Sequence, residues 1–366
     1  MRPLRIGVNA LYLIPGGVGG TEIYLRSLLA ALARIDSVNR YLVFTNRETG
    51  ADLVPKAPTF THKPQHVRAT SRPARILWEQ AVLPFAAVDV MFNPGFTAPL
   101  FFNGPQVTVF HDLQHKRHPE YFRWFDLPFW NFFLYWSAHI SRLLLADSQA
   151  AAADLFRYYR LPEAKVHVVP LAADAAFFEI ARRRKPEPFL LTVATLHPHK
   201  NLEGLLRAFA QFRRERPEFR LVVCGMHGFA KEKVHALRDS LELADAVDFP
   251  GWIPREDLHD LYARAWAFVF PTLFEGFGIP IVEALAAGVP SACSNIEPVS
   301  SIAGSAALKL DPHNPDAIAD ALRRIVSDDA LRARLTQAGP SRAAEFSWER
   351  TARATVEAIE SVCPSP

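Results

Sequence analysis

The strongest constraint on the fold of this chain is an alternation of short apolar runs with helical patterns along nearly its whole length. The first run is followed by a glycine-rich turn and by a helix whose Leu25, Leu28, Leu29 and Leu32 share one face. In the first half, strands are expected at residues 6–10, 41–45, 107–110, 143–146 and 166–169. Such alternation predicts an α/β protein whose mostly parallel sheet is covered by helices on both faces.

The same alternation restarts after residues 181–188, a charged segment with two prolines that is typical of a linker. Further strands are expected at residues 190–194, 221–224, 247–249 and 267–270. A chain of 366 residues exceeds the size at which one core keeps growing. We therefore predict two doubly wound domains, residues 1–180 and 181–345, and a helix at 346–366 that packs back on the first. Ligands are expected in a cleft at the carboxyl ends of the strands.

Composition excludes several classes of protein. With 41 basic and 38 acidic residues the net charge is only +3, which argues against a nucleic-acid binder. Cys224, Cys293 and Cys363 are too far apart for a disulfide framework or a zinc site, which fits a reducing cytosol. No signal peptide is expected. The longest plausible membrane segment, residues 127–141, carries no charge but is shorter than the roughly 20 residues that span a bilayer.

The turn after the first strand has the sequence PGGVGGTE, at residues 15–22. Glycines let the backbone approach a ligand closely, and the helix that follows offers unpaired N–H groups to an anion. The turn therefore suits a diphosphate or a sugar, although a mobile strand–helix connection has the same composition. Neither the GxGxxG dinucleotide fingerprint nor a GxxxxGK[ST] motif is present.

Polar residues follow two further strands. His111 and Asp112 come directly after residues 107–110 and suit hydrogen bonding or proton transfer at a sugar. The alternative is an Asp cap beside a surface His, and we expect no metal site at His115 or His118. Lys200, in TLHPHKN, stands before a helix, where it could bind a phosphate or lie in solvent.

The segment 268–284, FVFPTLFEGFGIPIVEA, is the most informative. It predicts a strand, a loop and a helix, with Pro280 in the first turn and Gly288 at the end. Glu275 then lies in the loop and Glu283 about one turn into the helix. Carboxylates accept hydrogen bonds from paired sugar hydroxyls, and an acid near a helix start suits a ribose. Interaction of Glu283 with the helix dipole alone would not explain the preceding FEGFG.

These residues together resemble the retaining glycosyltransferases of family four, often called group 1 transferases. The pattern of two glutamates separated by seven residues, in FEGFGIPIVEALAAGVP, is the hallmark of that family. Other segments match in the same order, namely GGVGGTE, VFHDLQHKRHPEYF, ADSQAAAADL, VHVVPLAAD, TLHPHKNLEGLLRAF, GWIPREDLHDLYARA and SNIEPVSSIAGSAALKLDP. The resemblance covers nearly the whole chain and implies the GT-B fold, in which two Rossmann-like domains face a central cleft.

The resemblance assigns roles to residues of the second half. Glu275 matches the glutamate that contacts hydroxyls of the donor sugar, and Glu283 matches the one that binds the nucleotide ribose. The loop whose backbone amides hold the sugar corresponds to Gly276, Phe277 and Gly278. Lys200 matches the lysine that binds the diphosphate of the donor.

In the first half, Gly19 and Gly20 match the glycine loop over the diphosphate. His111 matches a histidine near the 6-hydroxyl of the sugar. The chain departs from the family where an arginine usually begins the lysine motif, because Thr195 and His199 stand there instead. Both remain candidates for donor binding, and the diphosphate clamp is the least regular part of the match.

The resemblance implies transfer of a hexose with retention of configuration, from a nucleoside-diphosphate sugar to a glycan or lipid-linked saccharide in surface-polysaccharide assembly. No DxD triplet occurs, so catalysis without a metal and without a cofactor is expected. GDP-mannose is the favoured donor and a UDP-sugar the second choice. A GT-B epimerase, a phosphorylase or a non-catalytic sugar-nucleotide-binding protein would share the fold. The acceptor, the linkage and the oligomeric state do not follow from the sequence.

Residues 121–136 are rich in aromatic side chains, with Phe125, Phe129, Phe132, Phe133 and Trp136 on one helical face. Packing in the core is the favoured interpretation. The alternative is an acceptor or membrane surface, near arginines that would contact anionic head groups. We therefore expect a cytoplasmic protein, with peripheral contact to the inner face of the membrane as an option.

Overall fold

The computed structural model describes residues 3–363, which form two compact units. The first unit extends to Leu171 and includes the segment from Trp348 onward, while the second spans Ala172–Ser347. The division lies ahead of the predicted boundary at residue 180, because α6 (Ala175–Ile180) packs against α9 and α10 of the second unit. The charged segment 181–188 therefore lies inside the second unit.

The first unit contains a seven-stranded parallel sheet with the order β3-β2-β1-β4-β5-β6-β7. Its strands are β1 (Arg5–Asn9), β2 (Arg40–Thr45), β3 (Phe60–Pro64), β4 (Val90–Asn93), β5 (Gln106–Phe110), β6 (Leu143–Ala146) and β7 (Val166–Val168). The five predicted strands are confirmed, whereas β3 and β4 were not predicted. In β3 only Phe60 is buried, so an edge strand of this kind lacks the apolar run that marks the others.

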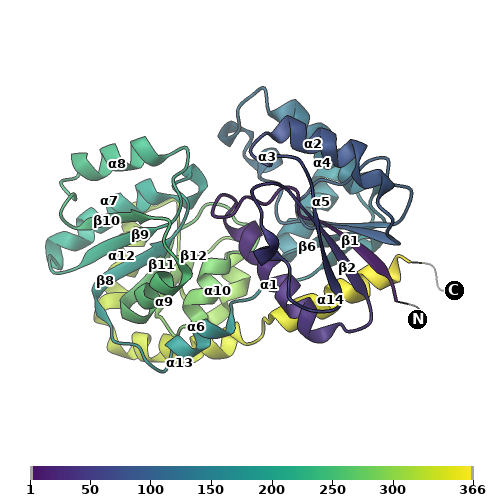
Figure 1. The fold of residues 1–366 in the computed structure, drawn as a ribbon. Coiled ribbons are helices and arrows are strands. Elements are labelled where there is room, and N and C mark those ends of the chain that lie inside the picture. Colours follow the sequence, from purple (N-terminus) through teal and green to yellow (C-terminus); the bar gives the residue numbers. More distant parts are fainter. Residues whose placement is uncertain (1–2, 364–366) are drawn as a thin grey trace. The chain divides into compact units, whose positions relative to one another are not determined.

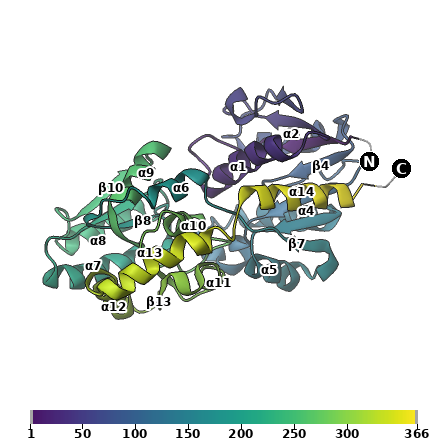
Figure 2. The ribbon, with the colours of Figure 1, turned by 90° about the horizontal axis from the view of Figure 1, so that it is seen from below.

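Helices cover both faces of this sheet (Figure 1). They are α1 (Gly20–Ile35), α2 (Arg72–Ala81), α3 (Gln114–Arg117), α4 (Leu127–Ile140), α5 (Gln149–Tyr159) and α14 (Trp348–Ser361). The strand order reverses between β1 and β4, so right-handed crossovers place α1 on one face and α2, α4 and α5 on the other. The last helix, α14, packs beside α1 (Figure 2).

The second unit contains a six-stranded parallel sheet with the order β10-β9-β8-β11-β12-β13. Its strands are β8 (Glu187–Val193), β9 (Arg220–Cys224), β10 (Val247–Gly251), β11 (Ala265–Phe270), β12 (Ser291–Ser294) and β13 (Leu308–Leu310). Its helices are α6, α7 (Leu202–Glu215), α8 (Lys231–Ser240), α9 (Arg255–Arg264), α10 (Ile279–Ala286), α11 (Val299–Ala303), α12 (Pro315–Ser327) and α13 (Asp329–Ala343). The prediction of an α/β protein with two doubly wound sheets is thus confirmed.

Amphipathic helices build the core of the second unit. Leu205, Leu206, Phe209 and Phe212 of α7 are almost fully buried against the sheet and α12, as their spacing predicts. The strand order reverses between β8 and β11. Open parallel sheets bind ligands beyond the carboxyl ends of the strands at such a reversal. The loops after these two strands contain Lys200 and Glu275.

Candidate functional site

The loops after β8 and β11 of the second unit are joined by hydrogen bonds. The carbonyl oxygen of His199 accepts from the Leu273 amide at 2.7 Å and from Thr272 Oγ1 at 3.0 Å. The Asn201 side-chain amide donates to the carbonyl oxygens of Pro271, at 3.0 Å, and Pro312, at 2.6 Å. Two segments seventy residues apart in sequence therefore hold a fixed register at the carboxyl edge of the sheet.

This register brings Lys200 and Glu275 into contact. Lys200 Nζ donates to Glu275 Oε1 at 2.6 Å, and both side chains are largely buried. The ammonium group also lies 5.7 Å from the centre of the Phe270 ring. A charged pair in so little water is only weakly screened. The pair thus presents a cation and a carboxylate side by side at the strand reversal.

Backbone amides at the start of α10 adjoin this pair. Gly278 has a φ of 102°, a conformation that favours glycine, and no side chain of the described residues caps the helix. Pro280 occupies the first turn, as predicted. The ring of Phe277 is buried against Phe346, 5.7 Å between centroids, so the backbone of Gly276–Gly278 is the part suited to a ligand. A helix start of this kind attracts anions.

Glu283 is 1% exposed and lies on α10 among polar partners. Arg255 Nη2 lies 2.9 Å from Oε1 as an ion pair, and the Tyr262 hydroxyl donates to Oε2 at 3.3 Å. Arg255 also donates to Asp174 at 2.7 Å. Oε1 nevertheless receives no aligned hydrogen bond from a described residue. Burial raises the pKa of Glu283, although Arg255 opposes that shift.

Sequence reasoning missed Arg255 and Tyr262 as partners of Glu283. Both lie on α9, within the segment GWIPREDLHDLYARA that matches the family. The match of that segment to the family pointed to this region, but only the fold reveals that Arg255 and Tyr262 of α9 face Glu283 of α10.

The residues that replace the expected arginine have different surroundings. His199 Nδ1 lies 2.8 Å from His197 Nδ1, so one ring donates and the other accepts. Burial, together with Lys200, lowers the pKa of His197 and favours its neutral form. Gly228 lies close to the backbone that follows Thr195. A Cβ added to Gly228 would lie 2.4 Å from the Leu196 carbonyl oxygen. The loop after β9 therefore closes over residues 194–197.

His111 of the first unit is buried between two acceptors. Nδ1 lies 2.8 Å from Asp147 Oδ2 and Nε2 lies 3.0 Å from the Pro94 carbonyl oxygen. Only the imidazolium form donates to both. Burial lowers the pKa of His111, but the charge and hydrogen bond of Asp147, with the Pro94 carbonyl, offset this and raise it above the ordinary 6.5. Tyr24 and Phe96 meet the ring edge-on.

The partner of His111 is therefore Asp147 and not the adjacent Asp112. Asp112 Oδ1 accepts a hydrogen bond from the Gln114 amide at 2.9 Å, which is the capping role weighed as an alternative. Asp147 directly follows β6, within the family-like segment ADSQAAAADL, and sequence reasoning assigned it no role.

The glycine turn is ordered by an acid that sequence reasoning did not single out. Glu22 Oε2 accepts from the Gly16 amide at 2.7 Å, and Glu22 Oε1 accepts from Arg26 Nε at 2.8 Å. Gly19, with a φ of 59°, directly precedes α1, which begins at Gly20. The turn is thus tied to the first turn of the helix that it precedes.

His115 and His118, which follow His111 closely in the chain, have different partners. His115 contacts the Tyr159 hydroxyl at 3.0 Å and His118 contacts Glu120 at 3.0 Å. Across residues 3–363, no group of three or more His, Cys, Asp or Glu is arranged to hold a metal ion. None of the described helices is long and apolar enough to cross a membrane.

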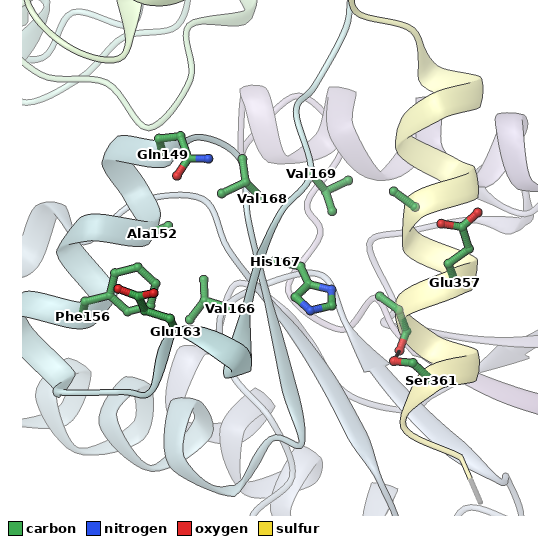
Figure 3. Close-up of a pocket in the computed structure, with 12 residues that line it drawn as sticks. Gln149, Ala152, Phe156, Glu163, Val166, His167, Val168, Val169, Glu357 and Ser361 are labelled. Atoms are coloured by element: carbon green, nitrogen blue, oxygen red, sulfur yellow. Dashed lines mark hydrogen bonds between the residues drawn. The ribbon is translucent and has the colours of Figure 1, made fainter. Parts of the chain in front are cut away.

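A separate pocket of about 850 Å³ lies between β7, α5 and α14 of the first unit (Figure 3). His167 lies between the two helices, with Glu357 and Ser361 on α14. Within the sheet, β7 pairs only with β6, so the pocket adjoins a free sheet edge. None of the candidate site residues predicted from the sequence lines this pocket.

Comparisons with known proteins agree with this geometry. The model described as Glycosyltransferase Family 4 matches residues 18–177, and that of Glycosyl transferases group 1 matches residues 174–342. O-antigen chain mannosyltransferase B of Escherichia coli is 30% identical over 269 residues, 69% of this chain and 70% of the relative. Serotype-specific mannosyltransferase WbdA of Escherichia coli is 28% identical over 69% of this chain, which spans only 33% of WbdA.

Among solved structures, Anabaena HepE in complex with UDP and glucose superposes with a TM-score of 0.77 at 17% identity, covering 98% of this chain and 100% of HepE. The two sheets and this likeness define a protein of the GT-B class. The chain belongs to the family four glycosyltransferases, the group 1 transferases.

The pKa of His111 gives a prediction about pH. A pKa raised by folding contributes stability that is complete below the unfolded value of about 6.5 and is lost as the pH rises through the folded pKa. NMR titration of the His111 ring should show a pKa above 6.5, and Asp147→Asn should lower it. The stability difference between wild type and this variant should shrink as the pH rises through the folded pKa. A wild-type ring that titrates at or below 6.5 would contradict the assignment.

Proposed function

We propose that the protein is a retaining hexosyltransferase. It moves mannose or a related hexose from a nucleoside-diphosphate sugar to a glycan or lipid-linked saccharide during surface-polysaccharide assembly. The observation that carries the proposal is the pair formed by Lys200 and Glu275 beside the start of α10, at the strand reversal of the second sheet. Relatives described as mannosyltransferases support mannose, with GDP-mannose as the first donor to test and a UDP-sugar as the second.

Charge on the leaving nucleoside diphosphate is the main electrostatic demand of the reaction. Lys200 and the amides of Gly276, Phe277 and Gly278 would meet it, since a fixed cation and a helix start both stabilise phosphate oxygens. Thr195 and His199 are proposed to complete this clamp in place of the family arginine. The proposal requires neither a metal ion nor a cofactor.

The two glutamates are proposed to bind different parts of the donor. Glu275, in the loop, would accept hydrogen bonds from sugar hydroxyls. Glu283 would accept from the ribose diol, while Arg255, ion-paired with Oε1, and Tyr262, bonded to Oε2, hold the carboxylate in place. For Gly19, Gly20 and His111 of the first unit we propose the family roles at the diphosphate and the 6-hydroxyl. His111 would act through its charge, because both ring nitrogens are already bonded.

The proposed reaction proceeds on one face of the sugar. The bond between the anomeric carbon and the diphosphate oxygen breaks, and the acceptor oxygen bonds to the same face of that carbon. The acceptor proton passes to the departing diphosphate. Glu275 is held by Lys200, so we assign it to binding and not to nucleophilic attack.

Activity measurements test this site. Lys200→Ala and Glu275→Ala should each lower kcat/KM more than tenfold, about 1.4 kcal/mol or more of transition-state stabilisation. Lys231→Ala and Glu232→Ala, exposed charges on α8, serve as controls. Release of nucleoside diphosphate is scored for each donor with and without glycan acceptors, and NMR identifies the anomer formed. An inverted product would exclude retention, and binding without turnover would favour a non-catalytic protein.

Of the five aromatic residues predicted to share a face, three are exposed and Phe129 and Phe133 are half-buried, so the favoured prediction of core packing is wrong. Leu134 and Ala138 of α4 are buried, whereas Trp124, Phe125, Phe132, Tyr135 and Trp136 lie at the surface. The helix is apolar nearly all round, so the sequence pattern did not reveal which face is covered. Exposed Trp and Tyr are typical of membrane interfaces, and Arg123, which could meet anionic head groups, directly precedes Trp124. We propose that this aromatic surface contacts the membrane peripherally.

Vesicle binding tests the aromatic surface. Trp124→Ser and Phe132→Ser should each weaken sedimentation with phosphatidylglycerol vesicles several-fold, because each removes apolar area that would enter the interface. Trp252→Ser removes an exposed tryptophan of the second unit and should leave vesicle binding unchanged. Equal binding by all three variants and wild type would reject the proposal.

A further inference from the structure

Arg75 of α2 is a buried cation that the proposed chemistry does not use. Its side chain is 6% exposed, and none of its five N–H donors has a hydrogen-bond or ion-pair partner among residues 3–363. Burial lowers the pKa of Arg75, although Glu79 and Tyr12 raise it. Its nitrogens are not among the fully buried, unpartnered polar atoms of the described residues, so the guanidinium keeps some contact with solvent and a ligand can reach its donors. The fold therefore holds a charge that no described residue neutralises by direct contact.

The nearest acid does not fill these donors. Glu79 lies one turn further along α2 and accepts from Asn9 at 3.1 Å, Thr97 at 2.9 Å and Gln80 at 3.1 Å. Burial raises the pKa of Glu79, while Arg75 and these hydrogen bonds lower it. Its carboxylate is thus served by neutral donors, and its attraction to Arg75 acts only at a distance.

The position of Arg75 on the helix favours an anion. It is the fourth residue of α2, and helical side chains lean toward the N-terminus of their helix. Ser71 precedes the helix without a side-chain hydrogen bond to it. The N–H groups of a first turn have no partner within the helix and attract negative charge. A guanidinium and a helix start therefore favour the same kind of ligand.

Arg75 also lies near the predicted residues of the first unit. Burial and Glu22 raise the pKa of Tyr12, Arg75 lowers it and Asp147 raises it, so the Tyr12 phenol is within electrostatic reach of both Arg75 and Asp147. The Tyr12 ring packs on Gly95 so closely that a Cβ there would lie 2.2 Å from Cδ1. Gly95 follows Pro94, whose carbonyl binds His111.

These residues gather where the first sheet reverses its strand order. β1 ends at Asn9 and β4 at Asn93, and the two side chains are joined by a hydrogen bond of 3.2 Å. Such a reversal is where open parallel sheets bind ligands. Next to Arg75 on the helix, Arg72 lies 4.7 Å from the Trp130 ring of α4. The Arg75 position therefore borders the helix that contributes to the aromatic surface.

We propose that Arg75 binds a phosphoryl group of the acceptor. The planar guanidinium matches phosphate oxygens in pairs, and the start of α2 adds backbone donors. A phosphate that joins a lipid to a saccharide would lie between the aromatic surface and the carboxyl ends of the strands. The assignment rests on the proposed function, since only a transferase has an acceptor. The phosphate could belong to a lipid or to a free sugar phosphate.

Phosphate binding measured by calorimetry tests the assignment. All proteins compared carry Lys200→Ala, which removes phosphate binding in the second unit, and the protein with this change alone is the parent. Inorganic phosphate should bind the parent, and Arg75→Gln should weaken binding more than tenfold. Arg47→Gln removes an exposed arginine of the same unit and should leave binding unchanged. Arg75→Lys keeps the charge without the paired geometry and should fall between. Equal phosphate binding in Arg75→Gln and the parent would overturn the proposal.

Two further readouts separate the explanations. If octyl phosphate binds more tightly than inorganic phosphate, the natural phosphate belongs to a lipid; equal affinity indicates a free sugar phosphate. If octyl glucoside binds as tightly as octyl phosphate, the proposal is overturned. Without ligand, Arg75→Gln should melt no lower than the parent, and marked destabilisation would make Arg75 structural. Glycosyl transfer is measured in proteins that keep Lys200. Phosphate binding by the Lys200→Ala parent without transfer by the wild type would reject only the proposed function, and transfer by the wild type without phosphate binding by that parent would reject only this inference.

Discussion

The contact between Lys200 and Glu275 organises the second unit around two loops that are distant in sequence. It forms because the His199 carbonyl and the Asn201 side chain bind the loop after β11. A long lysine side chain in water would adopt many rotamers, and fixing it costs conformational entropy. Here burial and the carboxylate keep it in one place before any ligand arrives. A phosphate that replaces Glu275 as the partner of Lys200 would find the cation already positioned.

The first unit uses buried charge in a different way. Burial lowers the pKa of His111, but Asp147 and the Pro94 carbonyl outweigh this effect and raise that pKa. Arg75, in contrast, has no side-chain hydrogen-bond partner among the described residues. Tyr12 is coupled electrostatically to Arg75 and to Asp147, which is the hydrogen-bond partner of His111. The fold thus supplies direct partners for His111, whereas the donors of Arg75 are available to a ligand.

Much of the fold followed from the sequence, because parallel strands buried on both faces must be apolar runs. Three missed strands show why others escaped. β3 is an edge strand with one buried residue, β12 has the small side chains of SACS, and β4 has an apolar run of only three residues, VMF. At the candidate site, Glu275 and Glu283 were singled out from the loop and helix pattern of FEGFGIPIVEA, and Lys200 from its place before a helix in TLHPHKN. Their roles come from the family resemblance and stay predictions.

Their partners were not predictable in the same way. Asp147 meets His111, and Arg255 meets Glu283, through pairings of elements that only the folded sheets create. Arg75 could not be distinguished from a solvated arginine, since nothing in RPARILWEQA specifies that its guanidinium is buried. The exposure of the aromatic surface was not predicted, for a related reason. A helix that is apolar on all sides carries no periodic signal of which face meets solvent.

The central claim is that Lys200 and Glu275 hold different parts of one donor. Calorimetry with a nucleoside diphosphate and with the corresponding nucleotide sugar, on Lys200→Met and Glu275→Gln, tests it most directly. We predict that Lys200→Met weakens binding of both ligands. Glu275→Gln should weaken only the nucleotide sugar, and should leave the diphosphate unaffected or bound more tightly, because Lys200 is released from its partner. An equal loss of both ligands in Glu275→Gln would contradict the account.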